Sequence, residues 1–515
     1  MILNELNDIN LEDFPVIIFG SGPAGITTAL ELEEKNIKSI IIEAGEENYS
    51  ENSQILYKGE TYGDPITDLS TSRLRQFGGT SGHWGGWSKP IVDYNLRDWP
   101  LDINDLKPYK KKTAKILDIK NQFRKLEINQ YFDQIEFQYS NVRFADKYRE
   151  HIKKSEKILL ILNTQLSHFV GNNNKIQYAE CISKNIKRKI FSKYFILSCG
   201  GIENSRLLLW TKQKNRNLFD NEMPIGKYWM NHPWILGGAG LINKDKLKKK
   251  FGVNFLEYDG PIHFSVKEKF INDTKNLSAG IYMDANEDKN FFKEIVKDIL
   301  CIAPEYGRKI AGKFFNKSLK CGNIFMHLEE EPNVNNKIVL SEKKDKFEIP
   351  QVKLYYKKSS KSLSSAKNIL EEFANLCRKE NFGRIAIDEK IFKLEKFESM
   401  GAWHHMGGTR AGISKQISVV DKNLKVHNIE NIYINGSSNF TTGGYSNPTF
   451  TIIQLAIRLA DKTSSNASCS SSDSSFCRYL SPVAIKWTTG RTCSNAFEAN
   501  VNNVGAISVF SASST

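Results

Sequence analysis

Three glycines near the start of the chain have the spacing of a phosphate-binding turn. Gly20, Gly22 and Gly25 form the pattern G-x-G-x-x-G directly after the apolar run 16–19. In such a turn the first glycine permits a tight bend, the second lets backbone N–H groups approach a pyrophosphate, and the third allows close packing of helix on strand. The anion then lies at the N-terminus of the helix. This spacing predicts a dinucleotide site.

An acidic residue follows at the end of the next predicted strand. Residues 26–32 have helical spacing, 39–42 form a second apolar run, and Glu43 comes directly after that run. A carboxylate about 20 residues beyond the glycines can accept hydrogen bonds from a ribose. The strand, turn, helix and acidic residue together support the dinucleotide site. They do not distinguish FAD from NAD.

A second glycine-rich segment carries aromatic side chains. Five of the nine residues from Gly78 to Gly86 are glycine, and the segment includes Gly79-Thr80 and His83-Trp84. Such a density of glycine excludes a regular helix or central strand, because glycine is entropically unfavourable in both. A loop of this kind suits backbone that passes close to a flat ligand, whereas a solvent loop is the alternative. We predict contact with the cofactor.

Histidine and asparagine occur in two segments near the C-terminal end. His404-His405 precedes Met406-Gly407-Gly408-Thr409, and Asn447-Pro448-Thr449 follows later. An N-cap asparagine and an N1 proline predict a helix from Pro448 to about Ala460. A neutral imidazole suits general-base chemistry near neutral pH because its unperturbed pKa is ~6.5. The pair could also pack in the core or bind a metal, but no further ligand is evident nearby, so we predict no metal site.

The elements that position these residues form an α/β pattern, α+β overall. A third apolar run at 194–197 leads through Gly200 into a helix from Ile202, which repeats the strand–glycine–helix unit. Residues 158–163 and 175–182 are predicted strands of a small sheet. Alternating segments between 236 and 395 predict an antiparallel sheet. We therefore expect a Rossmann-like nucleotide-binding domain and a second domain built on an antiparallel sheet.

These motifs together resemble the glucose–methanol–choline (GMC) family of flavoprotein oxidoreductases, over roughly residues 14–461. The family has a GG-T-S-x-x-W-G-G loop against its flavin, which residues 78–86 match. The resemblance implies FAD as the cofactor. The cofactor-binding residues expected from the motifs are Gly20, Gly22, Gly25, Glu43, Gly79, Thr80, His83, Trp84, Gly200, Asn435, Gly436, Asn447, Pro448 and Thr449.

The resemblance also implies a reaction, the oxidation of a CH–OH group of a sugar or other alcohol with hydride transfer to flavin N5. His405 and Asn447 match the family's catalytic histidine and its His/Asn partner, and His404 is the adjacent alternative. His405 would take the hydroxyl proton, and Asn447 would hold the substrate oxygen. We interpret His232, which precedes Pro233, as structural rather than catalytic, because Asn-His-Pro is typical of a turn.

Several alternatives remain open at the level of sequence. His83 falls where some family members carry a histidine bonded covalently to the 8α-methyl carbon of the flavin, so both a covalent bond and non-covalent packing are consistent with it. A redox-silent flavoprotein, such as a cyanohydrin lyase on the same scaffold, and a non-catalytic binding protein are rival functions. The electron acceptor is unknown.

The motifs divide the chain into six segments. Residues 14–100, 156–235 and 396–461 are expected to form three parts of the FAD-binding domain, the last with the catalytic residues. Residues 101–155 are expected to be a lid or linker, and 236–395 the substrate-binding domain. The serine-rich residues 462–515 are expected to form a disordered tail.

Composition limits the classes of protein to be considered. The chain has 515 residues, 40% hydrophobic and 25% charged, as in globular proteins. We expect a cytoplasmic protein without a transmembrane segment, because no apolar run approaches ~18 residues and the first residues lack a basic start and an apolar block. The net charge is +14, but the lysine runs are not interleaved with aromatics, so no nucleic-acid partner is expected. The eight cysteines include no C-x-x-C pair, which argues against a redox-active disulfide.

Overall fold

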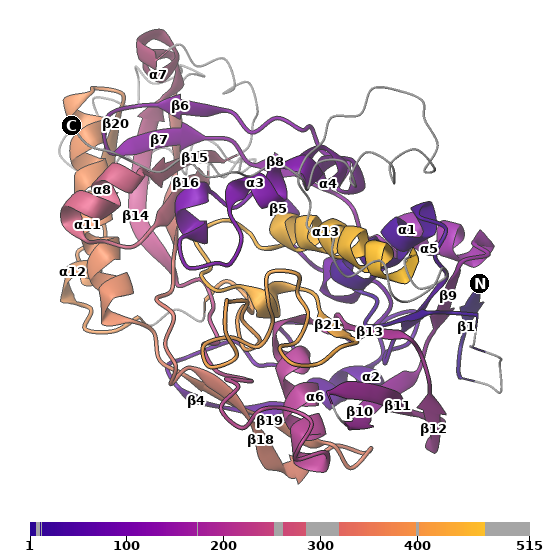
Figure 1. The fold of residues 1–515 in the computed structure, drawn as a ribbon. Helices are drawn as coiled ribbons and strands as arrows, with labels where there is room; N and C mark the ends of the chain where they lie inside the picture. The colour runs from indigo at the N-terminus through magenta and orange to yellow at the C-terminus, as the bar shows by residue number, and fades with distance from the viewer. Residues whose placement is uncertain are drawn as a thin grey trace, which may run out of the picture. The chain divides into compact units, whose positions relative to one another are not determined.

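The structure is a computed structural model that describes residues 1–6, 11, 13–172, 174–251, 261–284, 319–397 and 401–468. The chain divides into two compact units, Met1–Ala467 and Ser468–Thr515. Every element that positions the site belongs to the first unit (Figure 1).

A six-stranded, wholly parallel sheet forms the centre of the nucleotide-binding part. Its strands are, in spatial order, β1 (Ile2–Leu3), β9 (Ile158–Ile161), β3 (Ser39–Ile42), β2 (Val16–Phe19), β13 (Tyr194–Leu197) and β21 (Ile432–Ile434). The strands are short apolar runs, and every residue of β2, β3, β9 and β21 is buried. Burial on both faces is typical of parallel sheets, whose helical crossovers cover each side. This sheet confirms the predicted α/β class.

Helices follow the strands that carry the glycine motifs. The helices of this part are α1 (Pro23–Glu34), α2 (Glu51–Gln54), α3 (Ile103–Leu106), α4 (Lys110–Ile116), α5 (Phe144–Lys154), α6 (Gly200–Lys214) and α13 (Thr449–Ser468). α1 follows β2 and α6 follows β13, so both helices begin at the carboxyl edge of the sheet. Ligands of open α/β sheets bind at this edge.

A seven-stranded antiparallel sheet forms the second part, as expected. Its strands are, in spatial order, β20 (Gly383–Ile387), β14 (Trp234–Asn243), β17 (Leu319–Leu328), β16 (Ala279–Asp284), β15 (Ile262–Val266), β7 (Phe132–Ile135) and β6 (Lys125–Glu127). Figure 1 shows α11 (Ser360–Lys379) beside this sheet, where Phe373 packs on Phe132 and Phe264. The shorter helices α7 (Lys244–Phe251), α8 (Glu268–Thr274) and α12 (Lys390–Lys393) also belong to this part.

Three small sheets accompany the two large ones. They are β10 (Thr164–Asn172), β11 (Lys175–Ser183) and β12 (Ile186–Ile190); β18 (Lys337–Lys344), β19 (Pro350–Tyr356) and β4 (Gly59–Gly63); and β5 (Trp87–Ser88) with β8 (Gln138–Tyr139). The prediction for residues 158–163 was wrong in one respect. β9 pairs in parallel with β3 and belongs to the central sheet, whereas β11 lies in a small sheet.

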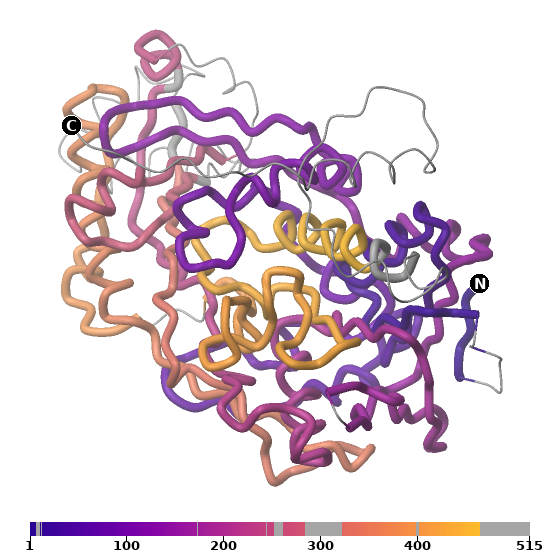
Figure 2. Tube along the Cα trace, in the orientation of Figure 1, coloured from indigo at the N-terminus to yellow at the C-terminus, as the bar shows by residue number. Residues whose placement is uncertain are grey.

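Segments far apart in the sequence meet in this unit, as the colours of Figure 2 show. The parallel sheet takes its strands from residues 2–42, 158–197 and 432–434. Residues 101–155, expected as a lid or linker, contribute β6 and β7 to the antiparallel sheet.

The predicted helix after Asn447 is present and runs further than expected. It was expected to end near Ala460, but α13 continues to Ser468 and so includes the first residues of the segment expected as a disordered tail. Residues 469–515 lie outside the described residues. Among the described helices, none combines the length and the apolar composition required to cross a membrane.

Candidate functional site

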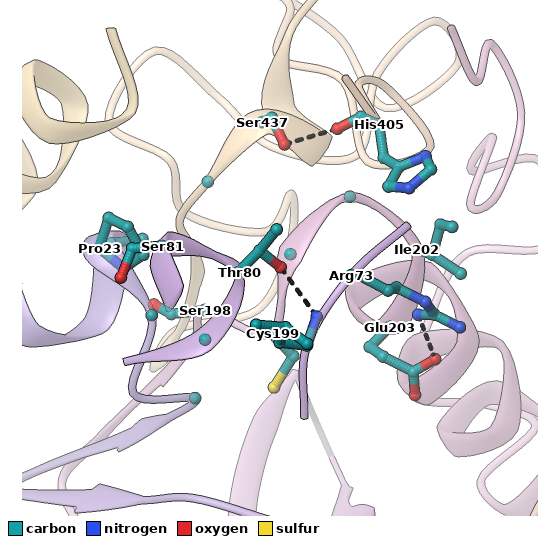
Figure 3. Close-up of a pocket in the computed structure, with 18 of the residues that line it drawn as sticks. Pro23, Arg73, Thr80, Ser81, Ser198, Cys199, Ile202, Glu203, His405 and Ser437 are labelled. Carbon is teal, nitrogen blue, oxygen red and sulfur yellow. Dashed lines mark hydrogen bonds and ion pairs between the residues drawn. The ribbon is translucent and has the colours of Figure 1, made fainter. Parts of the chain in front are cut away.

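A cavity of about 360 Å³ lies at the carboxyl edge of the parallel sheet. This volume falls within the ~300–1,000 Å³ of small-molecule and cofactor sites. Ten segments and the single residues Tyr57, Leu207 and Ile452 contribute to its walls; the segments are residues 19–24, 42–44, 72–75, 79–81, 83–87, 164–166, 198–203, 402–405, 436–437 and 447–449. Figure 3 shows several of these residues around the cavity. All the sequence motifs singled out above therefore converge on one space.

The glycine turn between β2 and α1 forms one end of the cavity. A Cβ at Gly25 would lie 1.9 Å from the carbonyl oxygen of Gly20, so only glycine permits this close approach of helix and strand. A Cβ at Gly22 would meet no atom within 4 Å and would project into open space, as would a Cβ at Gly85 or Gly200. These three glycines line the cavity and leave room for a ligand that lies directly against backbone.

Glu43 ties the turn to the end of β3. Its side chain is buried; Oε2 accepts hydrogen bonds from Ser21 N and Ser21 Oγ at 3.0 and 2.7 Å, and Oε1 accepts one from Gly45 N at 2.7 Å. A carboxylate offers about four acceptor positions. Glu43 therefore keeps capacity for one more donor, such as a ribose hydroxyl.

Arg75 also lines the cavity, although the sequence analysis did not single it out. The buried guanidinium donates to Ser53 Oγ at 2.7 Å and to Gln165 Oε1 at 2.6 Å, which are both neutral acceptors. Burial lowers the pKa of Arg75. A buried cation whose hydrogen-bond acceptors are neutral suits an anionic ligand. Its position three residues before Gly78-Gly79 is the only sequence signal for it.

His83 and Trp84 stand on the glycine-rich loop that forms a second wall. Trp84 Nε1 donates to the carbonyl oxygen of Val142 at 2.8 Å, which holds the loop to the start of α5. His83 Nε2 is buried without a hydrogen-bond partner, and the His83 ring lies 5.7 Å from that of Trp403. Burial, and then the charge of Arg143, lower the pKa of His83, so its ring is neutral near pH 7.

The structure places His404, not His405, beside Asn447. Nε2 of His404 lies 3.3 Å from Nδ2 of Asn447, directly before α13, and Nδ1 of His404 lies 2.8 Å from Nδ1 of His232. Both His404 and Asn447 line the cavity. Burial holds the pKa of His404 well below its usual value, and the neighbouring His232, His327 and His405 lower it further. His404 is therefore a neutral imidazole beside an amide donor.

His405 lines the same cavity but has other partners, so the residue beside Asn447 is His404 and not the expected His405. Its Nε2 lies 3.0 Å from Ser72 Oγ, and its ring lies 5.7 Å from that of Trp229. Figure 3 shows this ring on the side of Arg73 and Ile202. Burial lowers the pKa of His405 to about 3, with a further contribution from the charge of Arg73. Met406 pairs with Met230 as in a β-ladder, and neighbouring side chains alternate in such a segment.

The remaining predicted residues divide into two groups. Gly20, Gly79, Thr80, Gly436, Pro448 and Thr449 line the cavity as expected. Asn435 does not, and this expectation is corrected. Its fully buried amide nitrogen donates to Thr28 Oγ1 at 3.0 Å, which fastens the end of β21 to α1. Gly25 likewise acts through helix packing.

His232 was interpreted from the sequence as a structural turn residue, and the structure brings it into contact with His404. The sequence His232-Pro233 indicates a turn and gives no indication of the contact with His404. Among the described residues, no group of three or more His, Cys, Asp or Glu side chains converges in a way that could hold a metal ion.

Comparisons with known proteins point to one family of oxidoreductases. Residues 332–456 match the family model for GMC oxidoreductase. The chain is 27% identical over 293 residues to 2-methyl-1,2-propanediol dehydrogenase of Mycolicibacterium austroafricanum, which covers 53% of this chain and 48% of that protein. It is 23% identical over 287 residues to the fructose dehydrogenase large subunit of Gluconobacter japonicus, with coverage of 53% and 47%. The chain thus spans about half the length of these curated relatives.

The fold has a counterpart among solved structures. Pyridoxine 4-oxidase from Mesorbium loti superposes with a TM-score of 0.58 at 12% identity, over 87% of this chain and 99% of that one. This likeness shows a shared fold. The family model, the relatives and the motifs at both ends of the cavity all point to the GMC oxidoreductases, to which this chain is similar.

Proposed function

We propose that the chain binds FAD in this cavity and oxidises a CH–OH group of a sugar or another alcohol. The observation that carries the proposal is the approach of His404 Nε2 to Asn447 Nδ2, 3.3 Å apart, in the wall of a cavity that begins at a dinucleotide-type glycine turn. The match of residues 332–456 to the GMC oxidoreductase family model supports both the cofactor and the reaction class.

The residues present suit FAD. The turn at Gly20 and Gly22, with the N-terminus of α1, would hold the pyrophosphate, and Arg75 supplies a buried positive charge in the same cavity. Glu43 has one acceptor position left for a ribose hydroxyl. The loop of Thr80 and His83 would lie against the ring system. Bound FAD would supply the hydride acceptor.

His404 would act as the general base of this reaction. Burial keeps its imidazole neutral, so that Nε2 can take the hydroxyl proton of the substrate while hydride leaves the carbon. Nδ2 of Asn447 would donate to the substrate oxygen, whose negative charge increases as the proton leaves. We assign the base to His404 and not to His405, since it is His404 that contacts Asn447.

A polyhydroxylated substrate fits the composition of the antiparallel sheet beside the histidines. The ring of His327 on β17 lies 5.9 Å from that of His404 and 5.5 Å from that of Tyr282 on β16. The ring of Tyr282 in turn lies 5.2 Å from that of Phe325. Aromatic faces pack against the C–H groups of a polyol, and phenol and imidazole groups can bond its hydroxyls. Two relatives are named for a diol and for fructose, which points in the same direction.

An anaerobic half-reaction tests the proposal. Purified protein should be yellow or should take up FAD, and mixing it without oxygen with a panel of diols, sugars and simple alcohols should bleach the flavin absorbance with at least one member. Protein that takes up no FAD would contradict the cofactor assignment. A bound flavin that no alcohol bleaches, together with cleavage of a cyanohydrin, would favour the lyase function.

A further inference from the structure

His232 lies directly behind the proposed base and is fully buried. Its Nδ1 is 2.8 Å from Nδ1 of His404, and its Nε2 is 3.3 Å from the carbonyl oxygen of Gly443. The two rings are nearly perpendicular, at 85°. Three polar groups therefore form one hydrogen-bonded chain: the Gly443 carbonyl, the His232 ring and the His404 ring.

The carbonyl oxygen at one end of this hydrogen-bonded chain determines which ring nitrogens carry a proton. A carbonyl oxygen only accepts, so Nε2 of His232 must carry hydrogen. Burial lowers the pKa of His232 to about 4, so near pH 7 the ring is neutral and its Nδ1 is a bare acceptor. His404 must then donate from Nδ1–H. Since His404 is also neutral, its Nε2 carries no hydrogen and accepts from Nδ2 of Asn447 at 3.3 Å.

We propose that His232 is a positioning residue that selects the Nδ1–H tautomer of His404 and so presents Nε2 to the substrate as a base. This inference rests on the proposed function of His404. During the reaction the hydroxyl proton of the substrate would bind to Nε2 of His404. The proton on Nδ1 of His404 would remain in the hydrogen bond to Nδ1 of His232, which keeps the His404 ring oriented while Nε2 is protonated.

The backbone around His232 supports this role. Met230 and Met406 exchange both of their backbone hydrogen bonds, at 2.8 and 2.9 Å, and Ala402 N donates to the carbonyl oxygen of His232 at 3.2 Å. The side-chain Oδ1 of Asn231 accepts from His404 N at 2.9 Å. The two histidines therefore stand on paired segments that fix the direction of each ring.

The third imidazole of the group does not compete for His404. The ring of His327 lies 6.3 Å from that of His232 and 5.9 Å from that of His404, further than a hydrogen-bonded pair of rings would be. Burial lowers the pKa of His327 to about 3, so it adds no charge near neutral pH. The acceptor for His404 Nδ1–H is therefore His232.

Two substitutions of His232 separate positioning from packing. His232→Gln keeps an acceptor and a donor in one amide, so it should retain the rate constant of anaerobic flavin reduction within about 5-fold of wild type. His232→Leu keeps bulk but has no acceptor, and we expect a loss of ~10–100-fold, the range found when a partner that orients a functional histidine is removed. His427→Leu is the matched control, because His427 likewise makes a ring-nitrogen hydrogen bond, to Ser418 Oγ at 2.8 Å, and does not line the cavity.

A spectroscopic measurement tests the tautomer without turnover. In wild-type protein with ¹⁵N-labelled histidine, the His404 signals, identified by their loss in His404→Asn, should show a protonated Nδ1 and an unprotonated Nε2. In His232→Leu this preference should weaken. A protonated Nε2 in wild type, or equal reduction rates in His232→Leu and wild type, would overturn the proposal. Should His232→Leu fail to fold, the wild-type spectrum still decides.

The two levels of the proposal can fail separately. If no alcohol reduces the wild-type flavin, the proposed function fails, and the nitrogen shifts of His404 still report whether His232 selects its tautomer. If wild type is reduced and His404 shows the other tautomer, the proposed function stands and the role of His232 is refuted.

Discussion

The side chains of the adjacent residues His404 and His405 contact different partners. His404 contacts Asn447 and His232, whereas His405 contacts Ser72 and packs on Trp229. His404 is half-buried and His405 is buried, and both are neutral, so residue type and charge do not distinguish them. What distinguishes them is the direction of each ring, toward Asn447 for His404 and toward Ser72 for His405.

Substituting each of the two histidines by asparagine should reveal this difference in function. We expect His404→Asn to reduce the rate constant of anaerobic flavin reduction by ~10²–10⁴-fold, the usual contribution of a general base. His405→Asn should have a much smaller effect, because it removes only a bond to Ser72 and packing on Trp229. Stopped-flow absorbance under anaerobic conditions measures both. If His405→Asn lowers this rate constant more than His404→Asn does, the general base is His405.

Three features of His83 are consistent with covalent attachment to the flavin. Its Nε2 is buried without a partner, its ring is neutral, and it lines the cavity. We expect wild-type protein to retain flavin fluorescence in a denaturing gel and His83→Ala to lose it while still binding FAD before denaturation. Flavin released from denatured wild-type protein would show that the histidine packs against the ring without a bond.

Sequence reasoning reached those site residues whose role is local. The turn at Gly20 and Gly22 and the carboxylate of Glu43 follow from a strand, a turn and a helix that are contiguous. The choice between His404 and His405 does not follow, because an error of one residue exchanges them. Asn435 resembled a cofactor ligand, but its direction depends on α1, which lies about 400 residues earlier.

At the scale of elements, apolar runs predicted strands well and sheet membership less well. Residues 158–161 form a strand as expected, but they join the parallel sheet through pairing with β3, more than 100 residues earlier. β6 and β7 likewise pair across the chain into the antiparallel sheet. Periodicity reports burial of a segment and not its partner, so long-range pairing required the structure.

A buried carboxyl group joins three elements and should give folding a distinct pH dependence. Glu330 follows β17, its Oε1 accepts from Ser359 N at the start of α11, and its Oε2 lies 3.0 Å from the hydroxyl of Tyr356 at the end of β19. Burial raises the pKa of Glu330 to about 8, against the opposing effect of these hydrogen bonds. Its protonated form is therefore favoured in the folded state.

The sign of the effect follows from linkage. The folded state binds a proton that the unfolded state has lost, so the contribution is fully present below the ordinary pKa of 4.5 and disappears as pH rises through about 8. Between these values stability should fall with pH by up to roughly 1.4 kcal/mol per unit. Glu330→Gln should remove this slope and be more stable than wild type above pH 8, as measured by thermal melts across pH. Glu331→Gln, at an exposed neighbour, is the control, and parallel curves for wild type and Glu330→Gln would refute the assignment.

At the scale of the molecule, one buried ion network fastens the cavity to the small sheet of β18 and β19. Arg73 donates to Glu203 at 2.7 Å, Arg206 donates to the other oxygen of Glu203 at 3.0 Å, and Arg206 also bonds Asp345 at 2.6 Å. The four side chains are almost completely buried and carry two positive and two negative charges. The network is neutral as a whole, so loss of one member leaves an uncompensated charge in the interior.

Glu203→Gln should therefore destabilise the protein by about 3–5 kcal/mol at pH 7, the cost of breaking a buried ion pair from one side. Burial alone would raise the pKa of Glu203, but Arg206 and Arg73 hold it below its usual value. Its contribution is thus present above the ordinary pKa of 4.5 and lost as pH falls through the lowered folded value, opposite in sign to that of Glu330. Urea unfolding at pH 7 and pH 4 should show a smaller difference between variant and wild type at the lower pH. Asp273→Asn, which breaks the exposed pair with Lys269, should match wild type at both pH values, and an equally small effect at Glu203 would mean that the buried network does not stabilise the fold.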